Sequence, residues 1–251
     1  SVEMMVAIHA VVAAGGQYVP VDVAAPADRV RYMYETAGAR VLLVADADGV
    51  PDAVDAANEA GVQVMTLDAS ALLDVDSAAA APVSDDERRA PLRPDDAAYT
   101  LFTSGSTGRP KGVTLSHAAV LNRLWWGLDA LPIGPDDVVM QKTPYTFDCS
   151  VPELFAPLAI GARVVVLADG GHLNPRQVAD EIARTGTTMV HFVPSMLSVF
   201  LEVVDREQLA ALDTIRIVST TGEALPPAVA APVRELWPDA WFFNLYGPTE
   251  A

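Results

Sequence analysis

Residues 98–112 read Ala98-Tyr99-Thr100-Leu101-Phe102-Thr103-Ser104-Gly105-Ser106-Thr107-Gly108-Arg109-Pro110-Lys111-Gly112, an apolar strand pattern followed by a loop of hydroxyl residues and glycines. Glycine lets backbone N–H groups turn toward an anion without a Cβ clash, and hydroxyls donate further hydrogen bonds. Lys111 adds a mobile positive charge. The stretch therefore predicts a strand that ends in a polyphosphate-binding loop.

Two better-known loop types do not fit this spacing. Pro110 stands where a Walker loop has glycine before its lysine, and Gly112 stands where that loop has serine or threonine. The pattern Gly-x-Ser-x-Gly of a hydrolase nucleophile is also absent. Alternatively, residues 103–112 form a flexible surface turn with no binding function, because turns favour these same residue types.

Around this loop, apolar β-branched runs alternate with helical patterns, which is typical of parallel strands joined by crossover helices. We therefore expect an α/β fold with two α/β lobes and mostly parallel sheets flanked by helices. The expected strands are Val41–Val44, Val62–Leu67, Ala98–Phe102, Val138–Gln141, Arg163–Leu167, Met189–Val193, Ile215–Ser219 and Trp241–Leu245. The expected helices are Val2–Ala14, Ala27–Ala37, Val50–Glu59, Ser116–Ala130, Pro175–Thr185, Pro194–Val204 and Pro226–Leu236.

A connector near 68–96 combines an alanine-rich patch with a charged run and prolines, so we expect it to be partly helical. It suggests sub-lobes 1–95 and 96–251. Ligands of such sheets bind beyond the carboxyl ends of the strands, where the glycine-rich segments of this chain lie.

Composition narrows the function classes. With 51% apolar and 20% charged residues, the chain can bury a large core. A net charge of −17 disfavours binding to nucleic acids or membranes by general electrostatics. The single cysteine, Cys149, excludes an internal disulfide and fits a reducing cytoplasm, and no Cys/His spacing supports a zinc site. The apolar run Met4–Ala14 is too short to span a bilayer and predicts a core helix.

Residues 103–112 resemble the signature of the adenylate-forming superfamily, which includes acyl-CoA synthetases, luciferases and the adenylation domains of nonribosomal peptide synthetases. Three further segments resemble the peptide-synthetase branch, namely Ala14–Asp22, Phe147-Asp148-Cys149-Ser150 and Asn244-Leu245-Tyr246-Gly247-Pro248-Thr249-Glu250. The first of these has a structural role in the family. The resemblance implies a partial adenylation domain over 1–251, the large N-terminal part of such an enzyme without its C-terminal lid domain.

The substrate site follows from that resemblance. Phe147 opens the substrate motif, and Asp148 would pair with the α-ammonium group of an amino acid, a role that the chemistry of a carboxylate supports independently. The alternative is that Asp148 caps a helix starting near Val151. The implied side-chain pocket comprises Cys149, Pro152, His191, Ser219, Thr221 and Leu245. Pro152 departs from the family's usual tryptophan, and His191 is alternatively an ordinary core histidine. Since no lysine or arginine falls on these positions, a neutral substrate side chain is expected.

For the nucleotide, the resemblance implies an adenine-side segment at Gly222-Glu223-Ala224. Tyr246 offers a face for adenine stacking, Asn244 a hydrogen bond at the base edge, and Thr249, beside Gly247, a contact to a phosphate oxygen. Glu250 is a hard oxygen ligand suited to Mg²⁺. The loop Thr103–Lys111 would hold the departing pyrophosphate.

The resemblance implies ATP-dependent activation of an amino acid to its adenylate, followed by transfer to the phosphopantetheine thiol of a carrier domain. The implied partners are the carrier and condensation domains of one synthetase and an MbtH-like helper protein. We expect the motifs to converge on one cleft, and we expect 1–251 alone to be inactive or nearly so. The alternatives are an acyl- or aryl-CoA ligase of the same superfamily and a non-catalytic interaction fragment.

Overall fold

The computed structural model describes residues 1–67, 81–104 and 108–250. These residues form two compact units, Val2–Asn122 and Arg123–Thr249, and the division falls within helix α5, His117–Ala130. The sequence placed the division near residue 95, inside a connector of which 68–80 lie outside the described residues. The rest of that connector, 81–96, contains turns and bends but no helix, so the expectation of helix there is wrong for this part.

In the first unit, two helices cover a small parallel sheet. Strands β1, Val41–Val44, and β2, Gln63–Thr66, pair in parallel, with Val41 opposite Gln63. Helices α2, Ala27–Ala37, and α3, Pro51–Glu59, enclose a core that includes Val30, Met33 and Ala57. Helix α1, Val2–Ala13, precedes them. Helices α2 and α3 and strands β1 and β2 therefore lie where the sequence predicted them.

The same unit contains a hairpin that the sequence did not predict. Strand β3, Ala97–Thr103, pairs antiparallel with β4, Lys111–Ser116, in a register that sets Thr103 opposite Lys111. The phosphate loop therefore connects two antiparallel strands, and Lys111 belongs to a strand rather than to a loop. Tyr18 forms a parallel bridge with Tyr99 on β3, so the early motif Ala14–Asp22 contributes backbone pairing.

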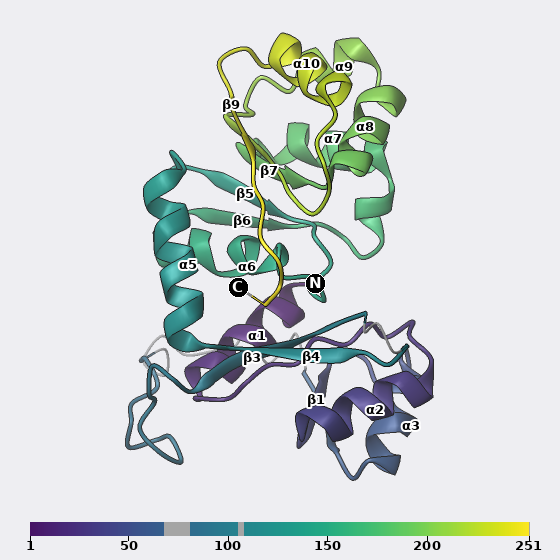
Figure 1. The fold of residues 1–251 in the computed structure, drawn as a ribbon, viewed down its shortest axis with the longest axis vertical. Coiled ribbons are helices and arrows are strands. Elements are labelled where there is room, and N and C mark those ends of the chain that lie inside the picture. The colour runs from purple at the N-terminus through teal and green to yellow at the C-terminus, as the bar shows by residue number, and fades with distance from the viewer. Residues whose placement is uncertain (68–80, 105–107, 251) are drawn as a thin grey trace. The chain divides into compact units, whose positions relative to one another are not determined.

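The second unit is built on a five-stranded parallel sheet of order β6-β5-β7-β8-β9. Its strands are β5 Val138–Gln141, β6 Arg163–Val166, β7 Met189–Phe192, β8 Ile217–Thr220 and β9 Trp241–Asn244. The connections include helices α6 Ser150–Ala159, α7 Pro175–Thr185, α8 Pro194–Val203, α9 Arg206–Ala210 and α10 Pro227–Leu236, and the short 3₁₀ helix η2 Gly171–Leu173 (Figure 1). Strand order reverses between β5 and β7, because β6 lies on one side of β5 and all later strands lie on the other.

Successive side chains along each strand point to opposite faces of this sheet, and each face has its own apolar cluster. Val190 on β7 and Val218 on β8 face a large apolar core shared with helices α7, α8 and α10, which contribute Ile182, Phe200 and Val233. A smaller apolar cluster contains Val139, Met189 and Ile217. The three helices begin at prolines, where the missing N–H costs nothing. Pro226 is the N-cap of α10 and Pro227 is its first residue, so the predicted start was one residue early.

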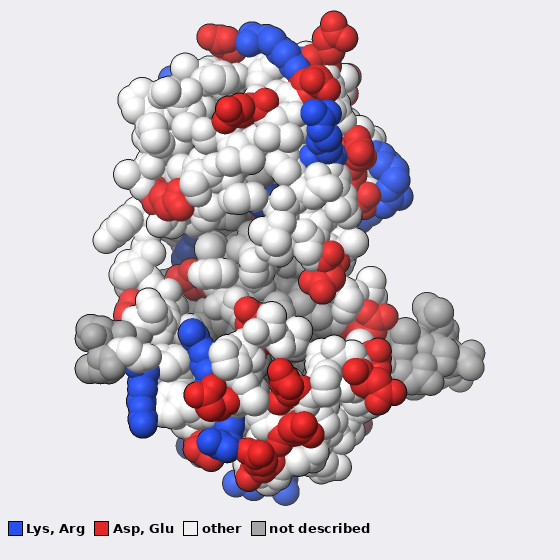
Figure 2. All heavy atoms as spheres, turned by 90° about the vertical axis from the view of Figure 1, so that its right-hand side faces the viewer, with Lys and Arg blue, Asp and Glu red and all other residues white. Residues whose placement is uncertain are grey.

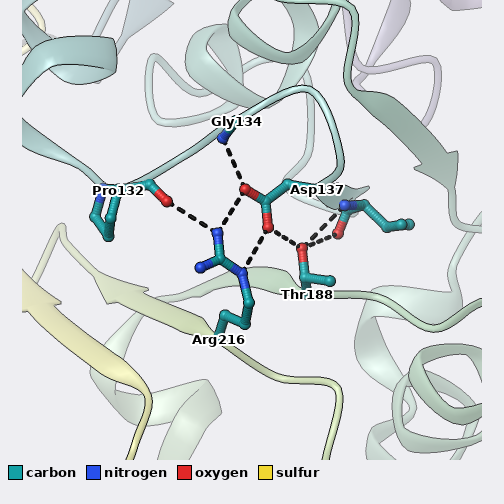
Figure 3. A network of polar contacts seen from close by, with 6 residues as sticks. Pro132, Gly134, Asp137, Thr188 and Arg216 are labelled. Atoms are coloured by element: carbon teal, nitrogen blue, oxygen red, sulfur yellow. Dashed lines mark hydrogen bonds and ion pairs between the residues drawn. The ribbon is translucent and has the colours of Figure 1, made fainter.

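A polar network joins the amino ends of three strands (Figure 3). Asp137, directly before β5, accepts hydrogen bonds from both Nε and a terminal nitrogen of Arg216, at 3.1 and 2.9 Å, and from the Thr188 hydroxyl at 2.6 Å. The Gly134 backbone N–H donates to the same carboxylate at 2.8 Å. Burial raises the pKa of Asp137, but these hydrogen bonds outweigh it and hold the pKa below its usual value.

Two further features of the described chain bear on function. Among the described residues, no helix is both long and apolar enough to cross a membrane. On the face drawn in Figure 2, acidic side chains are spread among neutral ones with a few basic groups between them, in keeping with the net charge of −17.

Candidate functional site

The carboxyl edge of the five-stranded sheet carries most of the substrate residues that the sequence predicted. Asp148 lies in the loop after β5, His191 on β7, Ser219 and Thr221 on or after β8, and Leu245 after β9. Backbone hydrogen bonds continue the sheet into this edge, since the Thr221 N–H donates to Phe192 and the Leu245 N–H to Thr220. The parallel topology thus brings segments far apart in sequence to one edge.

A small pocket lies where the strand order reverses. It has a volume of about 60 Å³ and is lined by residues 142–144 after β5, by His191 and Val193 at the end of β7, and by His172 and Met196. Ligands of open α/β sheets bind in the crevice beyond the strand ends at such a reversal. The pocket is therefore a candidate ligand site in the unit Arg123–Thr249.

His191 is a buried member of this pocket. Only 7% of the residue is exposed, and its Nδ1 lies 3.1 Å from the Ser219 hydroxyl oxygen, since the register sets His191 opposite Ser219. Burial, with a smaller contribution from the charge of Lys142, lowers the pKa of His191 to about 3. The imidazole is therefore neutral at physiological pH. The Nε2 atom is buried and has no hydrogen-bond partner among the described residues.

Lys142 is a pocket residue that the sequence did not identify. Its Nζ lies 4.3 Å from the centre of the Phe192 ring, and burial lowers its pKa while the nearby Glu153 carboxylate opposes that shift. Lys142 is not one of the pocket positions implied by the resemblance, so the expectation of a neutral substrate side chain, which rests on those positions, stays a prediction. The available signal was a lysine directly after the buried strand Val138–Gln141.

Glu153 on α6 fixes the segment that carries Lys142. The residue is 4% exposed, and one carboxylate oxygen accepts the backbone N–H groups of Lys142 and Thr143, both at 3.0 Å. The other oxygen accepts the Thr143 hydroxyl at 2.5 Å. Burial raises the pKa of Glu153, and Lys142 and these hydrogen bonds oppose the shift.

Asp148 does not cap helix α6. The N-cap residue is Cys149, which makes no side-chain capping bond, and one Asp148 oxygen accepts the Cys149 N–H at 2.8 Å. The helix-cap alternative is therefore wrong.

Burial, followed by the charges of Asp148 and Glu153, raises the pKa of the Cys149 thiol to about 12, so the thiol stays protonated. Phe147 is 58% exposed, and Pro152 lies in the first turn of α6.

The predicted adenine-side segment, Gly222–Ala224, is anchored through Glu223. Its two carboxylate oxygens accept the backbone N–H and the hydroxyl of Ser195, each at 2.9 Å. Ser195 supplies the first backbone N–H of α8, because Pro194 has none, and the N-cap Val193 has no side-chain acceptor. Glu223 therefore caps a neighbouring helix, and it holds the chain between Gly222 and Ala224 at the sheet edge.

Of the remaining residues predicted to bind the nucleotide, Tyr246 is 97% exposed, while Asn244 accepts a hydrogen bond from the Thr220 hydroxyl at 3.1 Å. Gly247 and Glu250 are exposed and Thr249 is half-buried. Within the described residues, no three His, Cys, Asp or Glu side chains are grouped to hold a metal ion.

The phosphate loop belongs to the unit Val2–Asn122 and is partly outside the described residues, which exclude Gly105, Ser106 and Thr107. Gly108 has a φ of 83°, which favours glycine. Arg109 lies over the ring of Tyr32, 5.6 Å from its centre, and Lys111 is exposed. The convergence of this loop with Asp148 and Tyr246 on one cleft stays a prediction.

Comparison with known proteins places these motifs in a family. The family model described as AMP-binding enzyme matches residues 1–251. The chain is 42% identical over 254 residues to phosphinothricin tripeptide synthetase PhsB of Streptomyces viridochromogenes and 38% identical over 252 residues to enterobactin synthase component F of Escherichia coli. It spans only 20% and 18% of those two proteins, although all of this chain is covered.

Among solved structures, the nonribosomal peptide synthetase FmoA3 superposes with a TM-score of 0.81 at 29% identity, over 100% of this chain and 25% of FmoA3. FmoA3 has also been solved with AMPPNP and with α-methyl-L-serine-AMP bound. The fold class is thereby confirmed as that of the N-terminal part of adenylation domains. The chain belongs to the AMP-binding enzyme family and is a segment of a nonribosomal peptide synthetase adenylation domain.

Proposed function

We propose that this chain is the part of an adenylation domain that binds an amino acid and ATP and activates the amino acid as its adenylate. The observation that carries the proposal is the position of Asp148. Its carboxylate follows β5 at the sheet's carboxyl edge, and its one described hydrogen bond comes from the adjacent Cys149 N–H. A carboxylate with remaining acceptor capacity suits an α-ammonium group, which fatty and aryl acids lack.

In the proposed reaction, a carboxylate oxygen of the amino acid forms a bond to the α-phosphorus of ATP. The bond from that phosphorus to the bridging oxygen breaks, and pyrophosphate leaves with the electron pair. Both reactants are anions, so the protein's task is to position them and neutralise charge. Asp148 orients the amine, Tyr246 and the Gly222–Ala224 segment hold the adenosine, and Lys111 with the 103–111 loop neutralises the departing pyrophosphate.

Mg²⁺ would be held by Glu250 together with phosphate oxygens of ATP. The fit is chemical, because Mg²⁺ in nucleotide sites takes one or two carboxylates and keeps water and phosphate oxygens as its other ligands. The exposed Glu250 supplies one such carboxylate, and no larger metal cluster occurs among the described residues. When bound, Mg²⁺ supplies charge neutralisation at the phosphates. Thr249 adds a hydroxyl beside it.

The later step is transfer of the aminoacyl group to the phosphopantetheine thiol of a carrier domain. The relatives PhsB and enterobactin synthase component F are synthetases much longer than this chain, which supports carrier and condensation domains as partners. FmoA3, solved with an ATP analogue and with an amino-acid adenylate, supports ATP and an amino acid as substrates. An MbtH-like helper belongs to the same proposal.

The test is amino-acid-dependent ATP–pyrophosphate exchange by the full synthetase with Asp148→Asn. Asparagine keeps the size of the side chain but removes the charge that pairs with the ammonium. We expect amino-acid kcat/KM to fall by about 10²–10³, as for loss of one preorganised charged contact, with little change in the KM for ATP. Asp213→Asn, at an exposed aspartate of the same unit, is the matched control.

Unchanged amino-acid kinetics in Asp148→Asn would refute the assignment of the ammonium site. Exchange that depends on fatty or aryl acids instead of amino acids would favour the CoA-ligase alternative. Nucleotide binding without exchange for any acid would favour a non-catalytic module.

A further inference from the structure

The position of Asp148 depends on the loop that carries it, residues 142–149 between β5 and α6. Its side chain accepts one described hydrogen bond, which comes from the neighbouring Cys149 N–H. A contact between adjacent residues orients the carboxylate relative to its own backbone, and it does not fix where that backbone lies. The loop must therefore be held by contacts made elsewhere.

The first part of the loop is held by Glu153, a buried side chain of α6. One Glu153 oxygen accepts the backbone N–H groups of Lys142 and Thr143, both at 3.0 Å, and the other accepts the Thr143 hydroxyl at 2.5 Å. The Thr143 carbonyl in turn accepts a hydrogen bond from the side chain of Gln141 at 2.9 Å. The backbone N–H, the carbonyl and the hydroxyl of Thr143 are thus all bonded to buried side chains.

The last part of the loop is held by Ser150, the first residue of α6, which is fully buried. Its hydroxyl donates to the Phe147 carbonyl at 2.6 Å, and its backbone N–H donates to the same oxygen at 3.0 Å. The Val151 N–H donates to the Asp148 carbonyl at 3.0 Å. Ser150 and Glu153 are three residues apart and so lie on one face of α6. A single turn of this helix therefore holds both parts of the loop.

Glu153 acts on the loop and not on a ligand. Only 4% of the residue is exposed, and both carboxylate oxygens already accept hydrogen bonds from the loop. To bind an ammonium group, the carboxylate would have to release these buried donors, and a buried donor without an acceptor costs free energy. The influence of Glu153 on a substrate therefore passes through the backbone of residues 142–148.

We propose that Glu153 is a positioning residue for amino-acid activation, because by holding the loop at Lys142 and Thr143 it places Asp148 where the α-ammonium group binds. The proposal rests on the proposed function and adds to it a residue outside the recognised motifs. A displacement of about 1 Å in an aligned group can cost about a hundredfold in rate. Loss of Glu153 should therefore weaken the use of the amino acid and leave the use of ATP almost unchanged.

The experiment is ATP–pyrophosphate exchange by the full synthetase with Glu153→Ala, with each proteinogenic amino acid offered singly, at a temperature at which the variant stays folded. For the amino acid that gives the fastest exchange, we expect the KM to rise by about tenfold or more, while the KM for ATP changes by less than about twofold. Glu153→Gln keeps an oxygen that accepts the two backbone N–H groups, so its amino-acid KM should stay within about threefold of the unsubstituted protein. A residue that only stabilises the fold would lower kcat through the active fraction and would not separate the two KM values.

Two further variants distinguish positioning from stability. Asp137→Ala removes a buried carboxylate of the same unit at the opposite end of β5, so it controls for lost stability, and both KM values should stay within about twofold. Ser150→Ala removes the hydroxyl that holds the Phe147 carbonyl. It should raise the amino-acid KM by about threefold to tenfold, the equivalent of one hydrogen bond, and it keeps the test open where Glu153→Ala does not fold.

The double variant Asp148→Asn with Glu153→Ala tests whether Glu153 acts through Asp148. Once the charge of Asp148 is lost, its placement matters little, so adding Glu153→Ala should reduce amino-acid kcat/KM by no more than about twofold further. Additive losses would show that Glu153 acts by another route and would overturn the inference.

The remaining outcomes separate this inference from the proposed function. An unchanged amino-acid KM in Glu153→Ala, or in Ser150→Ala where Glu153→Ala does not fold, overturns the positioning role while Asp148 keeps its assignment. An equal rise in Asp137→Ala does the same. Exchange supported by no amino acid, or unaffected by Asp148→Asn, overturns the proposed function and this inference together.

Discussion

Replacing Glu153 with alanine removes the carboxylate that holds the backbone of Lys142 and Thr143, two residues that line the pocket. Glu153 accepts the backbone N–H groups of Lys142 and Thr143 and the Thr143 hydroxyl. Thr143 is itself buried, at 7% exposure, so water cannot readily replace the lost acceptor. The substitution also leaves the charge of Lys142 without the carboxylate that opposes it.

The cost can be estimated from these contacts. A buried donor left without an acceptor costs about 1–3 kcal/mol, and breaking a buried charge pair costs about 3–5 kcal/mol in total. We therefore expect Glu153→Ala to lower the free energy of unfolding by about 3–5 kcal/mol, a large part of the roughly 5–15 kcal/mol available to a domain. Glu153→Gln should cost about 1–2 kcal/mol, because its carbonyl oxygen still accepts both N–H groups, while the charge and the acceptor for the Thr143 hydroxyl are lost.

Tryptophan fluorescence during urea unfolding measures this effect directly. All four tryptophans lie in Arg123–Thr249, at positions 125, 126, 237 and 241, so their emission follows the unit that contains Glu153. Glu235→Ala is the matched control, because this glutamate pairs with Arg206 at the surface and is 62% exposed. The control should cost less than about 1 kcal/mol. If Glu153→Ala proves no more destabilising than Glu235→Ala, the assigned role of the buried carboxylate is refuted.

Two further predictions concern other polar contacts of this unit. Asp137→Ala should destabilise the unit by about 2–4 kcal/mol at pH 7, through loss of a buried carboxylate that holds Arg216. Because hydrogen bonds hold the pKa of Asp137 below its usual value, this stabilisation is complete above the unfolded pKa of about 3.9 and is lost as pH falls through the folded pKa. A difference in unfolding free energy that is as large at pH 2 as at pH 7 would contradict it. Glu223→Ala and Ser195→Ala should each weaken the start of α8, and their double-mutant cycle should show a coupling of about 0.5–2 kcal/mol; strictly additive effects would show that the two side chains act independently.

The sequence predicted the strands of the five-stranded sheet because each is a short apolar run followed by a clear crossover pattern. It missed β4, because Lys111 and Gly112 at its start have the composition of a loop, and only Val113 and Leu115 alternate in the manner of a strand. The sequence did not predict helix α6, because Pro152 and Pro157 lie inside it. Proline ordinarily ends a helix, and here packing against the sheet outweighs that penalty.

From the sequence, only the site residues that belong to recognised motifs could be predicted. Asp148 and Glu223 were selected by resemblance, but the contact of Glu223 with Ser195 depends on two loops that meet at the sheet edge. The pairing of His191 with Ser219 depends on strand register, which the sequence of a parallel sheet does not specify without its crossovers. Lys142 matches no motif, and its burial beside Phe192 depends on the fold.

The two ends of the strands in the five-stranded sheet have different roles. At the amino ends, Asp137, Thr188 and Arg216 tie neighbouring strands together, whereas the candidate pocket lies at the carboxyl ends. Substrate preference can therefore be redesigned by exchanging the loops after β5, β7 and β8 as a set, because the bonds that align these strands stay in the recipient. If an exchanged segment begins on the amino side of Asp137 or Arg216, it replaces one partner of the network and leaves the other. We expect such chimaeras to give less folded protein before their substrate selectivity changes.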